Sequence, residues 1–229
     1  MHLGTRLPFS LRITARLINA AVRLVYGDAR LEVNEELLDT MGWRRYVRVI
    51  RDTYALVGSM NARYGEADTQ FLIGMSAMWN GCGFCSYGHV LTGALLVYRD
   101  RGVLHPLHAE VVAELMDMRT ERALEALQEI LCDYPALYEQ ILRMYALRAG
   151  RFRPETTDDY LLDACHQVWT LYVECTIVLG LTMEPDEAFC PAHTIGRDKR
   201  LIARYRRALE RERMVSGGGG YTPDLDTTT

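Results

Sequence analysis

The chain has 229 residues, of which 49% are hydrophobic, and a formal net charge of −4 at pH 7. This size and apolar content can supply a sizeable core and exclude wholesale disorder. The weak net charge disfavours a general nucleic-acid binder, which would be basic overall. Six cysteines are too few for a disulfide scaffold in a chain of this length, so we expect a reducing, cytoplasmic setting.

The chain begins with "MHLGTRLPFSLRITARL", in which Arg6, Arg12 and Arg16 interrupt the apolar run that a signal peptide needs. Apolar residues from Leu11 to Val25 share one face of a predicted helix, opposite its arginines. We expect this helix to be an arm that packs on its own domain or on a partner subunit. A helix lying on a membrane surface is the alternative.

Helical periodicity dominates the rest of the chain and predicts an all-α fold. The expected helices cover residues 33–41, 43–63, 66–79, 83–101, 106–118, 120–131, 135–149, 157–182 and 196–215. Gly102 and Gly150 fit the ends of helices, and Pro106 and Pro135 fit first turns. We expect one domain over residues 1–215, with its core at about 43–190, and a flexible tail over 216–229.

One uncharged segment is compatible with either a membrane span or a pair of buried helices. The run from Phe71 to Tyr98 is uncharged when His89 is neutral, and its length could span a bilayer. Its centre, "WNGCGFCSYGH", is polar and rich in glycine, so two buried helices joined by a tight turn fit better than a membrane span.

The last predicted helix is rich in arginine, and we interpret it as a solvated face with one docked apolar stripe rather than a nucleic-acid contact.

The segment "GCGFCSYGHV" places Cys82 and Cys85 three residues apart, with His89 four residues further on. A thiolate is the reactive form of cysteine, and a helix N-terminus, a nearby base or a second thiol in a CxxC arrangement lowers a thiol pKa. If a helix begins near Cys82, all three groups lie along one stripe of it. This arrangement predicts an attacking thiol, a resolving thiol and a base.

Two alternatives remain for this cysteine pair. A zinc site would need four ligands, and Cys190 with His193 could complete a Cys3His set; Cys165 and His166 are further candidates. Plain packing of buried cysteines is the other alternative. The aromatic residues Tyr64, Trp79 and Tyr87 flank the motif and fit either core packing or the wall of an apolar pocket.

The stretch "CGFCSYGH" resembles the CxxCxxxH signature of the AhpD-like alkylhydroperoxidases, in the carboxymuconolactone decarboxylase superfamily. The resemblance covers about residues 43–131, is weak over 132–190, and is absent from the arginine-rich helix and the tail. It implies an AhpD-like helical bundle that forms trimers or hexamers. Cys85 would then be the thiol that attacks peroxide, Cys82 the resolving thiol and His89 the relay histidine.

The chain departs from this family pattern at the relay carboxylate. The family has a glutamate twelve residues before the first cysteine, and this sequence has Gln70 there. A glutamine amide orients a neighbour but does not shuttle a proton near neutral pH. Glu66 lies one helical turn earlier, so water-mediated help is conceivable. Glu174 stands in an otherwise uncharged run, where a buried carboxylate would have a raised pKa unless it pairs with an arginine.

The first hypothesis is a thiol-dependent oxidoreductase that reduces hydroperoxides and is itself reduced by an external dithiol, without a cofactor or metal. The second is the same scaffold with a lost relay, acting in small-molecule binding or in proton transfer on a carbonyl compound. The third is a zinc-stabilised helical interaction protein. The expected partners are a small hydroperoxide, a dithiol electron donor and further copies of this chain, with no nucleic acid and no membrane span.

Overall fold

The computed structural model describes residues 9–26, 32–191 and 193–216, and within these ranges the chain forms helices and no strands. The predicted all-α fold is therefore confirmed for the described part of the chain. The helices are α1 (Phe9–Tyr26), α2 (Glu32–Tyr64), α3 (Glu66–Trp79), α4 (Gly83–Arg101), α5 (Ala109–Met116), α6 (Thr120–Ile130), α7 (Pro135–Arg148), α8 (Thr157–Val178) and α9 (Lys199–Ser216). Two short 3-10 helices, η1 (Pro185–Glu187) and η2 (Thr194–Arg197), lie between α8 and α9.

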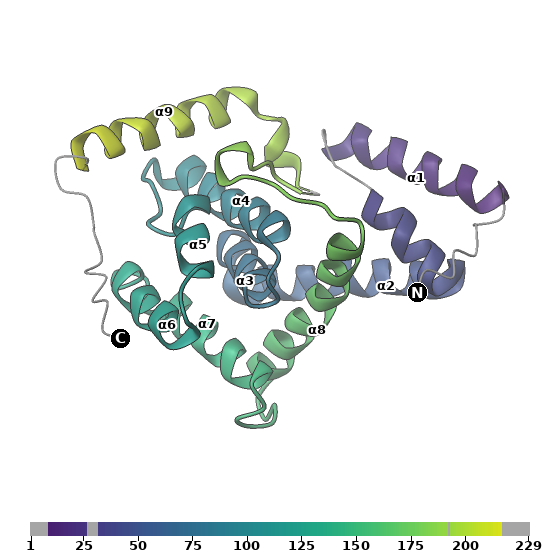
Figure 1. Ribbon diagram of the computed structural model, residues 1–229, viewed down its shortest axis with the longest axis horizontal. Coiled ribbons are helices and arrows are strands. Elements are labelled where there is room, and N and C mark those ends of the chain that lie inside the picture. The colour runs from purple at the N-terminus through teal and green to yellow at the C-terminus, as the bar shows by residue number, and fades with distance from the viewer. Residues whose placement is uncertain (1–8, 27–31, 192, 217–229) are drawn as a thin grey trace, which may run out of the picture.

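Helices α3 and α4 form the centre of the molecule (Figure 1). Glycines let them approach closely: a Cβ at Gly74 would lie 2.6 Å from Cγ2 of Val90, and one at Gly93 would lie 3.1 Å from the Phe71 ring. The main core cluster extends from Met60 in α2 to Leu209 in α9. The prediction of two buried helices is confirmed, and no helix among the described residues is long and apolar enough to cross a membrane.

The predicted glycine and proline boundaries are largely confirmed. Gly102 ends α4 in the left-handed conformation (φ 69°), and Pro135 begins α7. The predicted helix over 106–118 starts too early, because α5 begins only at Ala109. His105 holds the preceding loop: its buried ring accepts the N–H of Leu107 on Nδ1 at 3.1 Å. The predicted helix over 157–182 is also too long, since α8 ends at Val178 and Gly180 takes a positive φ of 63°.

Helix α1 and residues 32–41 of α2 form an extension that we call the arm (Figure 1). Gly42 separates these residues from the rest of α2, because its backbone is not helical (φ 72°, ψ 164°). The arm attaches through a small cluster that includes Leu37, Leu38 and Tyr46, with Cys175 from α8. The predicted N-terminal arm is thus present and packs on its own chain through α2.

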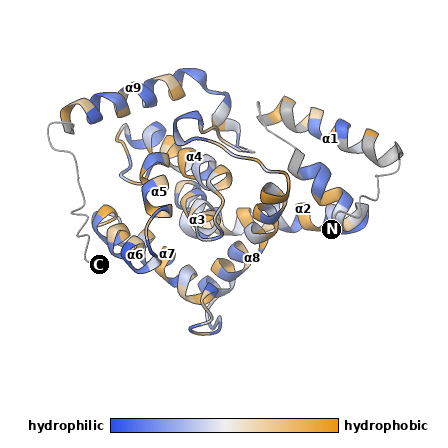
Figure 2. Cartoon of the chain, viewed as in Figure 1, coloured by the Kyte–Doolittle hydropathy of each residue, from blue (hydrophilic) through white to orange (hydrophobic). Residues whose placement is uncertain are grey.

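Helix α9 packs by one stripe, in which Leu201, Tyr205 and Leu209 are buried. Its arginines lie outside this stripe and are exposed, in keeping with the hydrophilic colour over much of α9 in Figure 2. The interpretation of α9 as a solvated face with one docked stripe is confirmed. The flexible tail was predicted over residues 216–229; Ser216 is instead the last residue of α9, and residues 217–229 lie outside the described residues.

Candidate functional site

Cys82 caps the N-terminus of α4. Gly81 makes the tight turn after α3 with a φ of 78°, and Cys82 follows in an extended conformation (φ −107°, ψ 96°). The sulfur of Cys82 accepts the backbone N–H of Cys85 at 3.3 Å. Sulfur therefore occupies the place of the usual capping oxygen, where free N–H groups and the helix dipole favour a negative charge.

Cys85 lies one turn into α4 and contacts α8. Its sulfur is 3.4 Å from Oγ1 of Thr176, which itself donates to the carbonyl oxygen of Tyr172 at 2.8 Å. Thr176 is buried and was not singled out from the sequence. Its polar side chain in the apolar run "CTIVLG" was the available signal, but only the fold brings it to Cys85.

The two thiols have opposite pKa shifts. The hydrogen bond from the Cys85 thiol, with a smaller contribution from the Cys85 N–H, holds the pKa of Cys82 below its ordinary value despite burial. The same contact with Cys82, together with burial, raises the pKa of Cys85 well above its ordinary value. The geometry therefore favours Cys82 as the thiolate. This is the reverse of the assignment that the family resemblance implies, in which Cys85 is the attacking thiol.

His89 contacts neither cysteine through a hydrogen bond in the described structure. The indole Nε1–H of Trp169 donates to Nε2 of His89 at 3.3 Å, so Nε2 carries no proton. Nδ1 must then carry it and donates to Oε1 of Gln70 at 2.8 Å. Burial, with a smaller effect of nearby His193, lowers the pKa of His89 to about 3. The ring is thus neutral, and both of its nitrogens are occupied.

Glu66 does not reach Gln70 through a hydrogen bond in the described residues. Its Oε1 accepts Nε2–H of His193 at 3.0 Å, and its Oε2 lies 3.6 Å from Arg99. The predicted site residues therefore divide into two groups. Cys82 and Cys85 form one with Thr176, while His89, Gln70 and Trp169 form the other.

The segment from Leu181 to Pro191, which we call the strap, covers the thiol pair. Phe189 packs edge-on against Phe84 with ring centroids 5.7 Å apart, and a Cβ at Gly88 would lie 2.8 Å from Cδ of Pro191. Leu181 and Met183 pack on the same cluster as the cysteines. Cys82 and Cys85 are consequently only 4% and 8% exposed. We therefore expect a reagent to reach these thiols only when the strap moves away from them.

Two cavities lie elsewhere in the described structure. One of about 180 Å³ lies between α4, α5, α9 and the strap, and is lined by Leu91, Ala188 and Tyr205 among others. The second, of about 640 Å³, is an open surface cavity beside Cys132 and Tyr138. Neither is lined by a residue of the predicted site. The flanking aromatics Tyr64, Trp79 and Tyr87 are partly buried, pack against the main core and line neither of these two cavities.

The predicted Cys3His zinc set is not assembled. Cys190 is buried in the main core cluster, where its pKa is raised by burial, whereas Cys82 and Cys85 belong to another cluster. His193 is engaged with Glu66. Cys165 is fully buried, and His166 contacts the hydroxyl of Ser76 through Nδ1. Over the described ranges, no group of three or more His, Cys, Asp or Glu side chains could hold a metal ion.

Glu174 is exposed rather than buried, which corrects the expectation of a carboxylate inside an apolar run. The helix α8 explains the error: its neighbours Val173 and Cys175 are buried, but Glu174 lies on the outer face between them. Glu174 is therefore not part of the thiol site.

No family model, no curated protein and no solved structure matches this chain. The likeness of "CGFCSYGH" to the AhpD-like signature therefore stays a prediction from the sequence.

Proposed function

We propose that this protein is a thiol-dependent oxidoreductase whose working group is the Cys82–Cys85 dithiol. The observation that carries the proposal is the position of Cys82 as a helix cap, with its sulfur accepting the N–H of Cys85. A thiol with a lowered pKa beside a second thiol is the usual arrangement of a redox-active CxxC pair. The other four cysteines lack such a pairing; Cys132 is exposed, and Cys165, Cys175 and Cys190 are buried with raised pKa values.

We propose a hydroperoxide as the oxidant, on the strength of the AhpD-like signature. The Cys82 thiolate attacks the terminal oxygen of the hydroperoxide, and the O–O bond breaks. Cys82 becomes a sulfenic acid, and the released alkoxide takes a proton from water to leave as an alcohol. Cys85 then attacks the sulfenic sulfur, loses its thiol proton and expels water, which leaves a Cys82–Cys85 disulfide. An external dithiol restores the pair by thiol–disulfide exchange and is itself oxidised.

His89 has no proton-relay role in this scheme. Its Nε2 lone pair is occupied by the Trp169 N–H, and its Nδ1 proton is used by Gln70. The relay that the resemblance implies is therefore replaced by local stabilisation of the thiolate at the helix N-terminus. The same occupied nitrogens leave His89 unsuited to proton transfer on a carbonyl compound, so the second hypothesis gains no support.

A thiol titration tests the proposal. The Cys132→Ser variant removes the exposed thiol from the background. One equivalent of hydrogen peroxide or an organic hydroperoxide should then remove two titratable thiols within minutes, and a dithiol should restore both. Adding Cys82→Ser to the Cys132→Ser variant should abolish this peroxide-dependent loss of two thiols. Unchanged thiol counts after many minutes with both oxidants would overturn the proposal.

A further inference from the structure

The bend in α2 carries an exposed apolar patch. Trp43 and Val47, just after the bend at Gly42, are 42% and 43% exposed, and we call these two residues the bend patch. Seven of the thirteen large apolar residues that are exposed in the described structure lie on α1 and α2, so exposed apolar surface concentrates at this end of the molecule. A concentration of this kind marks an interaction site.

The arm has little core of its own. The cluster that attaches it has four buried members, of which Leu37 and Leu38 belong to the arm and Tyr46 and Cys175 do not. Outside this cluster, Leu17 and Leu24 of α1 are 66% and 76% exposed. The arm thus leaves much of its apolar surface in water when the chain is alone, and a partner that covers it would add burial.

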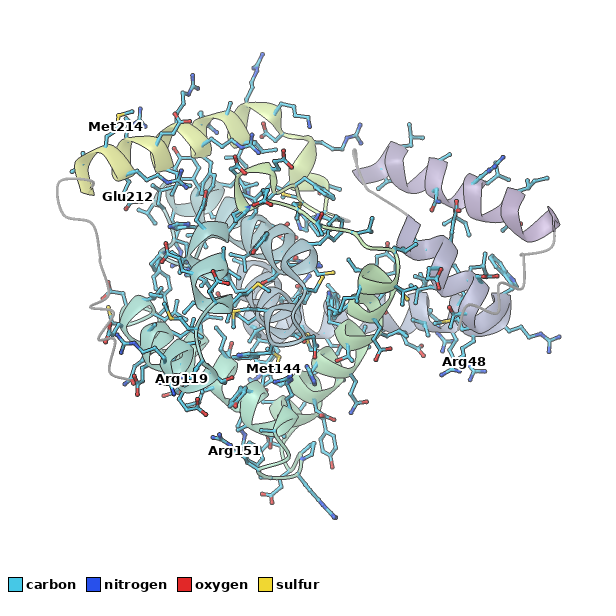
Figure 3. The ribbon with its side chains drawn as sticks, in the orientation of Figure 1. Arg48, Arg119, Met144, Arg151, Glu212 and Met214 are labelled. Atoms are coloured by element: carbon cyan, nitrogen blue, oxygen red, sulfur yellow. The ribbon has the colours of Figure 1, made fainter. Side chains whose placement is uncertain are left out.

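Charges of opposite sign flank the bend patch along the chain. Asp39 precedes the bend, while Arg44, Arg45 and Arg48 follow it, and all four are exposed. The structure gives these four side chains no hydrogen bond or ion pair among the described residues. Figure 3 shows Arg48 at the outer end of this part of the molecule, far from α6 and α7. Along the chain, an acidic residue therefore precedes the apolar patch and basic residues follow it.

We propose that the bend patch binds the bend patch of a second copy of this chain about a two-fold axis. Such an axis brings the same surface of both copies together and exchanges the two sides of the patch. The acidic side of each copy then faces the basic side of the other, with Asp39 opposite Arg48 in both halves. Trp43 and Val47 form the apolar centre, and the charges form the polar rim, which is the common anatomy of an interface.

Other occupants fit this surface less well. A nucleic acid or an anionic membrane would be attracted by Arg44 and Arg48 but repelled by the exposed carboxylate of Asp39, which is near them in the chain. A surface that carries both signs on either side of an apolar centre is complementary to itself. The inference does not depend on the redox proposal, because none of these residues contacts the thiol pair.

The oligomeric state in solution tests the apolar centre of the interface. Light scattering coupled to size exclusion should find the wild-type chain as a dimer, or as a multiple of dimers, at tens of micromolar. Val47→Asp should raise the dissociation constant at least roughly tenfold, because it places four carboxylates around one axis. Val103→Asp is the matched control: Val103 is 48% exposed in the loop after α4, and its substitution should leave the assembly unchanged. Circular dichroism confirms that both variants fold.

A charge-reversal experiment tests the two-fold pairing itself. Asp39→Lys and Arg48→Glu should each weaken self-association, because each places like charges opposite one another twice. An equimolar mixture of the two variants should associate as tightly as the wild type, since both contacts are then between opposite charges. A wild-type chain that stays monomeric, a Val47→Asp variant that assembles normally, or a mixture that gains nothing over its components would overturn the proposal.

Discussion

The indole Nε1–H of Trp169 donates to Nε2 of His89 at 3.3 Å, and this contact places the proton of the neutral ring on Nδ1. A protonated imidazole would present a second N–H to the indole donor, and one of the two donors would lose its partner. The ring is held in place from α3 by Gln70 and from α8 by Trp169. His89 therefore acts here as a structural link between helices.

This link predicts an acid-sensitive stability. The folded pKa of His89 is lowered to about 3 from an ordinary value of 6.5, so the unfolded chain binds the proton more readily. The stabilisation is complete above pH 6.5 and is lost as the pH falls toward 3. Between pH 7 and pH 5 the wild type should lose free energy of unfolding. The His89→Asn variant should lose roughly 1–2 kcal/mol less over the same range, because it has no histidine to protonate at this position. Urea unfolding at the two pH values measures this difference, and an identical loss in both proteins would contradict it.

Thr176 should tune the reactivity of the thiol pair. Its hydroxyl contacts Cys85 at 3.4 Å and also helps to lower the pKa of Cys82. Thr176→Val keeps the shape but removes the hydroxyl, so the pKa of Cys82 should rise and its alkylation at neutral pH should slow by roughly tenfold. Thr176→Ser keeps the hydroxyl and should restore the rate. Iodoacetamide kinetics across pH, with mass spectrometry to identify the modified cysteine, check both variants.

Gly88 should control access to the thiols through the strap. A Cβ at this position would lie 2.8 Å from Pro191 and 2.9 Å from the carbonyl oxygen of Phe189. Gly88→Ala should therefore displace the strap, cost about 1–3 kcal/mol and speed alkylation of Cys82 and Cys85. Gly58→Ala is the matched control, because a Cβ at Gly58 in α2 meets no atom within 4 Å. Slower alkylation in Gly88→Ala than in the control would refute the covering role of the strap.

The start of α8 offers a contrast between adjacent carboxylates. Asp159 is buried, completes the capping box with Thr156, and accepts two bonds from Arg143 at 2.6 and 2.9 Å, which hold its pKa well below the ordinary value. Asp159→Asn should cost about 2–4 kcal/mol, because the buried side chain loses its charge and would turn an amide donor toward the donors of Arg143 and Thr156. The ion pair of Asp158 with Arg63 is largely exposed. Asp158→Asn should therefore lower the free energy of unfolding by less than about 1 kcal/mol. Equal losses in denaturant unfolding would contradict this ranking.

The sequence predicted those parts of the structure that depend on local chemistry. The bounds of α3 and α4 were predicted correctly, because Gly65, Gly81 and Gly102 adopt positive φ values at their ends. The start of α5 was missed, since Pro106 resembles a first-turn residue while the His105 ring holds the loop in another conformation. Glu174 was misplaced because an uncharged run does not reveal which of its faces meets solvent.

In the candidate site, too, local spacing predicted some contacts and failed to predict others. Contact between Cys82 and Cys85 follows from a spacing of three at a helix start, and it is present. The predicted helical stripe suggested that His89 would serve Cys85, but the ring instead binds Gln70 and Trp169. Trp169 and Thr176 come from α8, 80 and 91 residues from their partners in α4. Such contacts depend on how the helices pack, which periodicity alone does not specify.

Locating the first oxidised sulfur tests the central claim most directly. Cys85→Ser and Cys82→Ser would each be treated with one equivalent of hydroperoxide in the presence of dimedone, which traps sulfenic acids, and mapped by mass spectrometry. We expect a dimedone adduct on Cys82 in the Cys85→Ser protein and no adduct on Cys85 in the Cys82→Ser protein. An adduct on Cys85 with an unmodified Cys82 would contradict the account and restore Cys85 as the attacking thiol.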